Sequence, residues 1–367
     1  MFWLISAFFF FNFSVVGIYV IFLPKILDTL GYSSFEIGVI FASAPLIRFL
    51  VPFLFLKYFS LNKRVLNLSL YMIFFSSLSF YVTIKDFYLF LISVSLYGIS
   101  SSLILPYIET FSLQYLKKEF YGKARLFGSL GFMIAGLVLA KYLDSYITGV
   151  HLFVILVVCT VVFSILISQK GTLSHVQKNK KAKKPFRFGK DFALWINIFL
   201  MQVSFGAFYN FFTIFESKHG ISLETVSYLW SFSIICEVAV FYFQTYFLKY
   251  DLRFLIKLST LITALRWLII YLYPSSLPFL YLQQSFHAVS FALYHTATLS
   301  YLYTLYKDKK LSSQFYYGFG FGLGGFLGSV LFGYLYGENI FLYASLIAAG
   351  GYIVMLLNKS LFFSDKT

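Results

Sequence analysis

The sequence predicts an all-α polytopic membrane protein with twelve transmembrane helices in two pseudo-symmetric six-helix bundles. Three observations support this fold class: the composition, the spacing of the apolar stretches and the distribution of basic residues. The 367 residues are 60% hydrophobic and only 12% charged, and the mean hydropathy is +0.81. This composition leaves too little polar surface for a soluble globular protein.

Apolar stretches long enough to cross a hydrocarbon core of ~30 Å follow one another along the chain. They occupy residues 2–24, 35–57, 66–84, 87–116, 124–143, 150–168, 191–216, 222–248, 253–273, 276–306, 313–336 and 339–358. The sequence therefore predicts twelve membrane spans.

Basic residues gather in alternate loops between these spans, as the positive-inside rule requires of cytoplasmic loops. The basic loops hold Lys57, Lys63, Arg64, Lys117, Lys118, Lys123, Arg125, the run from Lys170 to Lys190, Lys249, Arg253, Lys257, Lys307, Lys309, Lys310, Lys359 and Lys366. The opposite loops hold only Lys25, Lys85, Lys141 and Lys218, each near an acidic residue. We therefore expect both termini on the cytoplasmic side of a bacterial inner membrane.

The formal net charge of +15 is explained by this topology and does not indicate nucleic-acid binding. The basic run at 178–190 is interpreted as a solvated linker in preference to an anionic-lipid site. Cys159 and Cys236 lie alone within spans and fit neither a disulfide framework nor a metal site. We predict no metal and no organic cofactor.

The linker divides the chain into two halves with weak internal similarity. Gly31 to Glu36 opens the second span and Gly220 to Glu224 opens the eighth, and the residues seventeen positions after the two glycines are Arg48 and Glu237. A parallel repeat of six spans accounts for this correspondence. The predicted units are a first bundle 1–168, a linker 169–190, a second bundle 191–358 and a tail 359–367.

Glu237 is the only charge within residues 227–247. A charge at the middle of a membrane helix costs roughly 2.5–3.5 kcal/mol even on insertion scales, so such residues usually serve transport. Burial favours the protonated form of the Glu237 carboxyl, whereas a nearby Arg266 favours the ionised form. If the guanidinium moves towards and away from Glu237 between conformations, proton binding is coupled to the conformational change. His287 is predicted at the same depth. The alternative is a static ion pair with a packed histidine.

The tenth span carries a stripe of polar and aromatic residues. Gln283, His287, Phe291 and Tyr294 follow i, i+4, i+8, i+11 spacing, which places them on one helix face, and His295 lies beside it. We expect this face to line a substrate cavity. Each histidine is explained equally well as a proton-relay residue and as a packing residue hydrogen-bonded to a neighbouring helix. A metal site is disfavoured because the two histidines lie ~12 Å apart along the helix axis.

The first half offers a comparable pair, Arg48 and Glu109, which either bind substrate or neutralise each other. A guanidinium suits a carboxylate because of its planar donor fork, so Arg48 and Arg266 are candidates to hold an organic acid. Arg125 is predicted to act as a gate residue or a lipid-headgroup anchor. Further polar residues within spans, each a candidate substrate contact or a packing residue, are Tyr19, Gln202, Tyr209 and Asn210.

Several motifs resemble the phenylpropionate permease branch of the major facilitator superfamily, which is itself similar to lactose permease and nucleoside proton symporters. In the second half they are Gln202-Val-Ser-Phe-Gly-Ala-Phe-Tyr209, Ser227-Tyr-Leu-Trp230, Glu237, Leu265-Arg266-Trp267, Gln283, His287 and His295; in the first half they are Ile21-Phe-Leu-Pro24, Gly31, Ile37-Gly38, Arg48 and the segment from Tyr121 to Phe132. Two departures occur: the loop 57–64 lacks the usual glycine and aspartate, and the fifth span lacks the Gly-Pro pair of drug antiporters. The second departure favours a symporter over an exporter.

The resemblance implies the major facilitator fold and a secondary transporter that uses no cofactor besides the coupling proton. We expect a monomeric, proton-coupled importer of a small organic solute, with an aromatic or other monocarboxylate favoured and a sugar or nucleoside as the alternative substrate. An exporter, a membrane sensor and a membrane enzyme are less favoured, because the short loops leave no room for a catalytic domain.

Overall fold

A computed structural model describes residues 1–57, 62–116, 118–171 and 191–357. These residues are helical or lie in short turns, and they contain no strand. Most of the predicted linker and the whole predicted tail, residues 172–190 and 359–367, lie outside the described residues.

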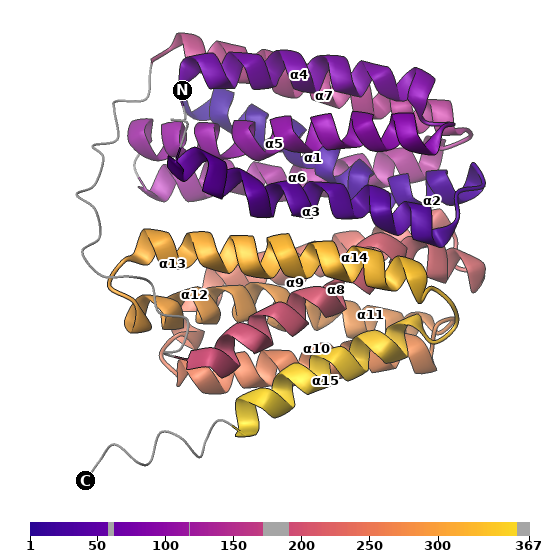
Figure 1. Cartoon of the computed structure of the whole chain (residues 1–367), viewed down its shortest axis with the longest axis vertical. Coiled ribbons are helices and arrows are strands. Elements are labelled where there is room, and N and C mark those ends of the chain that lie inside the picture. Colours follow the sequence, from indigo (N-terminus) through magenta and orange to yellow (C-terminus); the bar gives the residue numbers. More distant parts are fainter. Residues whose placement is uncertain (58–61, 117, 172–190, 358–367) are drawn as a thin grey trace.

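The helices form two groups (Figure 1). The first group, named here the N half, contains α1 (Phe2–Ile21), α2 (Leu23–Thr29), α3 (Ser34–Lys57), α4 (Lys63–Thr83), α5 (Phe87–Tyr115), α6 (Lys118–Tyr142) and α7 (Tyr146–Gln169). The second, the C half, contains α8 (Phe192–Lys218), α9 (Leu223–Phe247), α10 (Leu252–Leu272), α11 (Leu277–Ser285), η2 (Ala288–Leu293), α12 (Tyr294–Leu305), α13 (Lys309–Phe315), η3 (Tyr316–Gly324), α14 (Gly325–Tyr334) and α15 (Ile340–Leu357).

Ten helices among the described residues are long and apolar enough to span a membrane. The helix α3 and the interrupted run α11–η2–α12 occupy the two remaining predicted positions. The all-α, multi-helix membrane fold expected from the sequence is therefore confirmed. The start of α1 and the end of α15 lie at the same end of the helices, which we call the terminus side, and the opposite end is the far side (Figure 1).

Two turns on the far side have the same backbone structure. Gly31 and Gly220 adopt φ of 90° and 85°, a backbone conformation that residues other than glycine rarely adopt. In each turn the amide after the glycine donates across the helix end, from Tyr32 to the Leu27 carbonyl and from Ile221 to the Glu216 carbonyl. This is the Schellman end of a helix, and it makes Leu27 and Glu216 equivalent positions.

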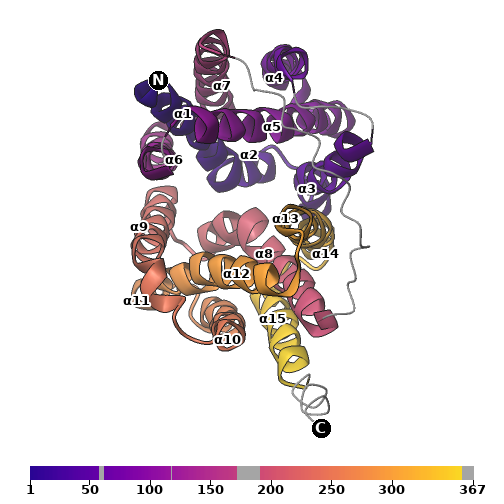
Figure 2. The same ribbon diagram turned by 90° about the vertical axis from the view of Figure 1, so that its left-hand side faces the viewer.

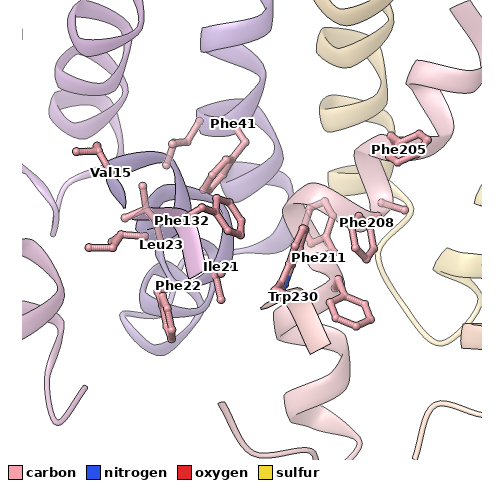
Figure 3. Close-up of a cluster of buried hydrophobic side chains, with 14 of the residues drawn as sticks. Val15, Ile21, Phe22, Leu23, Phe41, Phe132, Phe205, Phe208, Phe211 and Trp230 are labelled. Atoms are coloured by element: carbon pink, nitrogen blue, oxygen red, sulfur yellow. The ribbon is translucent and has the colours of Figure 1, made fainter. Parts of the chain in front are cut away.

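The halves meet along two helix pairs, α6 with α9 and α3 with α14 (Figure 2). In the first pair the rings of Phe132 and Trp230 lie 6.1 Å apart between centroids, within the apolar cluster drawn in Figure 3. In the second pair the backbones touch, because a Cβ placed on Gly38 would lie 2.8 Å from the Gly333 Cα. Small residues thus allow the halves to approach closely on the far side.

An ion pair also joins the two halves on the far side. Lys218 at the end of α8 lies 3.9 Å from Asp28 of α2, and Asp28 in turn accepts a 2.8 Å hydrogen bond from Lys25. The contact connects the C half to the N half next to the Gly31 and Gly220 turns. The far side is therefore closed in this conformation.

Candidate functional site

Arg266 of α10 is the most completely buried charge near the predicted site, with 0% of its surface exposed. Its guanidinium donates to the side-chain oxygens of Gln283 at 3.1 Å, Gln284 at 2.9 Å and Ser290 at 3.1 Å, and its Nη1 lies 2.9 Å from Nδ1 of His287. All four partners belong to α11 and η2 or to the residues between them. The planar donor fork of arginine is thereby satisfied inside the C half.

Two neighbouring aromatic rings pack against the same guanidinium. The Arg266 Cζ lies 4.3 Å from the ring centroid of Phe208 and 4.6 Å from that of Trp267. Cation–π contacts of this kind are strongest where water is excluded. Arg266 is therefore fixed in position by α8, α10 and the tenth span together.

His287 connects Arg266 to Glu237. Its Nε2 lies 3.4 Å from Oε2 of Glu237, while its Nδ1 faces Arg266. Arg266 and Glu237 form no ion pair with each other in this conformation, because the imidazole lies between them. The Glu237 side chain is 16% exposed, so the carboxylate forms the accessible end of a three-residue chain.

The predicted face of the tenth span is partly wrong. The rings of His287, Phe291 and His295 stack in a column, with interplanar angles of 6° and 14°, whereas Tyr294 points into the C half and donates to Asn197 at 2.8 Å. The cause is η2, since a π-helical turn contains more than four residues and shifts the following side chains by about one position. His295 therefore replaces Tyr294 on the predicted face.

The column ends against further tyrosines on the terminus side. The Nδ1 of His295 lies 3.2 Å from the Tyr316 hydroxyl and its Nε2 lies 3.4 Å from the Tyr317 hydroxyl. Phe321 packs edge-on against both Phe291 and His295. One wall of the C half is thus aromatic from Glu237 towards the terminus side.

Arg48 lies on the opposing wall. It is exposed although it is central in α3, and it is within electrostatic range of Tyr19 of its own half and Tyr209 of the other. Tyr209 is also within electrostatic range of Glu237 and Arg266. Arg48 forms no ion pair with any described residue, so its guanidinium is available to an anion between the halves.

Glu109 does not pair with Arg48, contrary to one of the two predicted interpretations. Its Oε1 lies 3.5 Å from Nε of Arg125, because both side chains face each other from the terminus-side parts of α5 and α6. The Arg125 guanidinium also stacks over Phe13 at 4.0 Å and acts electrostatically on Glu237 across the interface. Both members of the pair are about one-third exposed, so this ion pair is partly accessible from the terminus-side half of the helices.

The remaining predicted residues lie in helix contacts. Gln202 is buried against the glycines of η3, and Asn210 donates to Ser329 of α14 at 2.7 Å. Tyr209 differs from both, since its ring stacks on Trp230 with an angle of 21° and remains partly exposed. Sequence reasoning missed Gln284 and Ser290, which a search for polar residues within three positions of His287 would have found.

Paired bundles of membrane helices, with ionisable side chains where the bundles meet, define a secondary membrane transporter. The chain belongs to the MFS_1 like family, whose model matches residues 2–345. It is a transporter of the major facilitator type and not an enzyme.

Individual relatives agree with this assignment. The chain is 24% identical over 364 residues to the "Probable 3-phenylpropionic acid transporter" of Escherichia coli (strain K12), covering 94% of each chain. It is 26% identical over 287 residues to the "Uncharacterized transporter YwbF" of Bacillus subtilis (strain 168), covering 74% of this chain and 71% of that protein. The crystal structure of the nucleoside transporter NupG has the same fold, with a TM-score of 0.79, 15% identity and coverage of 97% of this chain and 98% of that one.

Proposed function

We propose that this transporter is a proton-coupled symporter that imports a small aromatic monocarboxylate. The observation that carries the proposal is the chain from Glu237 through His287 to Arg266, whose partly exposed end lies within electrostatic range of Arg125 in the N half. When Glu237 is ionised, the negative charge holds His287 and the guanidinium behind it. When Glu237 binds a proton, that attraction is lost and α9 is released from the tenth span.

The substrate would bind between Arg48 and the aromatic wall. Arg48 has no acidic partner among the described residues, and the buried Tyr19 hydroxyl has no hydrogen-bond partner among them. A carboxylate would accept from both groups. An aromatic ring would pack on Tyr209 and Phe291, and the phenylpropionic acid named for the Escherichia coli relative has this combination of groups.

The halves would rock about this site, with 1–168 and 191–358 as the moving units. The positive-inside rule supports an orientation in which the terminus side faces the cytoplasm, and we propose the inner membrane as the location. With that orientation, the closed far side and the partly exposed Glu109 and Arg125 describe an inward-facing state. We propose that a single chain in the lipid bilayer is the working unit.

Uptake into vesicles tests the substrate and the coupling together. Purified protein in proteoliposomes should accumulate radiolabelled 3-phenylpropionate when the outside is more acidic than the inside, and a proton uncoupler should abolish the accumulation. The matched alcohol 3-phenylpropanol, which keeps the ring and lacks the carboxylate, should not compete. Competition by uridine or lactose but not by aromatic acids would replace this proposal with the nucleoside or sugar alternative.

A further inference from the structure

Glu216, in the last turn of α8, is a buried carboxyl that the proposed transport chemistry does not use. The residue is 0% exposed, and neither of its carboxyl oxygens has a hydrogen-bond partner among the described residues. An ionised carboxylate without partners is very costly in an apolar interior. Glu216 therefore requires either a bound cation or a proton.

The packing of α8 against α9 brings two hydroxyl groups into the same region of the C half as this carboxyl. Phe212 of α8 contacts Trp230 of α9 at 6.0 Å between ring centroids, and a short turn joins these two antiparallel helices. One turn further towards the far side, the chain brings Glu216 level with Ser227. Thr213 lies one turn before Glu216 on the same face.

The hydroxyls are themselves unusual. Thr213 is 2% exposed and Ser227 is 0% exposed, and in the part of the chain that the structure describes neither hydroxyl oxygen has a hydrogen-bond partner. Buried hydroxyls are almost always hydrogen-bonded. Three unpartnered polar side chains within about one helical turn of one another therefore indicate a common ligand.

The other charged groups on the elements around the end of α8 are already engaged. They form the pairs Lys25–Asp28, Lys218–Asp28, His219–Glu338, Ser33–Glu36 and Tyr228–Glu224. Three tyrosines at this end are engaged elsewhere: Tyr336 packs on Phe211 and under Lys218, Tyr32 donates to the Ile84 carbonyl, and Tyr273 stacks on Phe279. No described basic side chain is paired with Glu216.

The internal repeat shows that the fold itself does not need a carboxyl here. Leu27 occupies the equivalent position of the N half, before the equivalent glycine turn, and is also 0% exposed. A leucine closes that turn by apolar packing alone. The C half thus has a carboxyl that is costly to bury where the N half has a leucine that stabilises the turn. Functional sites often lower stability in this way.

We propose that Glu216, together with Thr213 and Ser227, forms a second proton-binding site that is loaded from the far side. A protonated carboxyl can donate to one hydroxyl and accept from the other, which satisfies all three groups without a net charge. The Lys218–Asp28 contact, two residues along the chain from Glu216, would have to open for a proton to reach the site from the far side. Its use in the transport cycle rests on the proposed proton coupling, whereas its protonation does not.

Infrared difference spectroscopy tests the site in a Glu237→Gln background, which lacks the proposed coupling carboxyl. At pH 7, Glu237→Gln should show the carbonyl band of a protonated carboxylic acid that disappears when Glu216→Gln is added. In D2O the carboxyl proton should exchange slowly for deuterium, which shifts the band. With Lys218→Ala this exchange should be about two- to fivefold faster, the change expected from losing an exposed ion pair. Glu216→Leu should raise the melting temperature, which separates this role from a structural one.

One result would overturn the proposal, and a second measurement would then identify the ligand that takes the place of the proton. The absence of a Glu216-dependent band would show that the carboxyl is ionised. In that case sodium chloride, but not choline chloride, should raise the melting temperature of Glu237→Gln and not of the double variant, and a sodium site would replace the proton site. Because Glu237 is absent throughout, neither result bears on the proton coupling proposed for that residue.

Discussion

Replacing Arg266 with methionine tests how the buried network holds the site. Methionine keeps most of the side-chain volume and most of the packing against Phe208 and Trp267, but it has no hydrogen-bond donor. The side-chain oxygens of Gln283 and Gln284 then lose the donors observed at 3.1 and 2.9 Å. Each buried acceptor left unsatisfied costs about 1–3 kcal/mol, so we expect a destabilisation of about 3 kcal/mol.

Thermal unfolding in detergent, followed by intrinsic fluorescence, measures this effect. A loss of about 3 kcal/mol corresponds to a melting temperature about 6–12 °C lower, on the scale of large soluble domains. Arg266→Lys should fall between wild type and Arg266→Met, because one ammonium cannot reproduce the planar fork. The matched control is Arg64→Met, since Arg64 is exposed and surface substitutions change stability by about 0.5 kcal/mol or less.

The reasoning fails if Arg266→Met melts at or above the wild-type temperature while Arg64→Met is unchanged. Apolar replacements of whole buried ionic networks can stabilise proteins. That outcome would show that Gln283, Gln284 and His287 find other partners, so that Arg266 does not determine the position of the tenth span.

Three further predictions concern the interface, the topology and the binding site. Gly38→Ala should destabilise the closed far side by about 1–3 kcal/mol, because the added Cβ would lie 2.5 Å from the Ser329 carbonyl oxygen. Thiol labelling of cysteines placed on the far side should therefore increase. The control Gly122→Ala should leave this labelling unchanged, because no atom of another helix lies within 4 Å of the added Cβ. In a variant without the native cysteines, Ser275→Cys should react with an impermeant thiol reagent in intact cells and Lys63→Cys only after lysis, and the reverse pattern would invert the proposed topology. Arg48→Lys should weaken binding of 3-phenylpropionate about tenfold or more by calorimetry, since a bidentate contact is lost; unchanged affinity would remove Arg48 from the site.

Hydropathy and loop charge were sufficient to predict the fold class, since both depend on the membrane and not on tertiary detail. The twelve predicted spans correspond to helices of the structure, and the glycine turns at Gly31 and Gly220 recur with the same backbone hydrogen bonds. The local chain determines such turns, because only glycine adopts the required φ without strain.

The side-chain partners could not be predicted in the same way. An ideal helix places Tyr294 on the face of His287, but the π-helical turn η2 puts His295 there instead, and a composition of Ala-Val-Ser-Phe-Ala-Leu gives no signal for such a turn. The interposition of His287 between Glu237 and Arg266 depends on how α9, α10 and η2 pack, which span spacing does not determine.

Glu216 was missed for a different reason. It lies at the end of a predicted span, two residues before Lys218 and three before His219, so the sequence there suggests an ordinary polar helix end. Only the three-dimensional packing shows that the carboxyl is enclosed while its charged neighbours are exposed or paired. Comparison with Leu27 then identifies the position as exceptional.

The most direct test of the central claim is to separate accumulation from exchange in Glu237→Gln. Glutamine keeps the shape of the protonated carboxyl and cannot release a proton, so proteoliposomes carrying this variant should exchange 3-phenylpropionate with preloaded substrate at close to the wild-type rate while failing to accumulate it against a gradient. If accumulation survives, or if accumulation and exchange are lost in parallel, Glu237 does not carry the coupling proton.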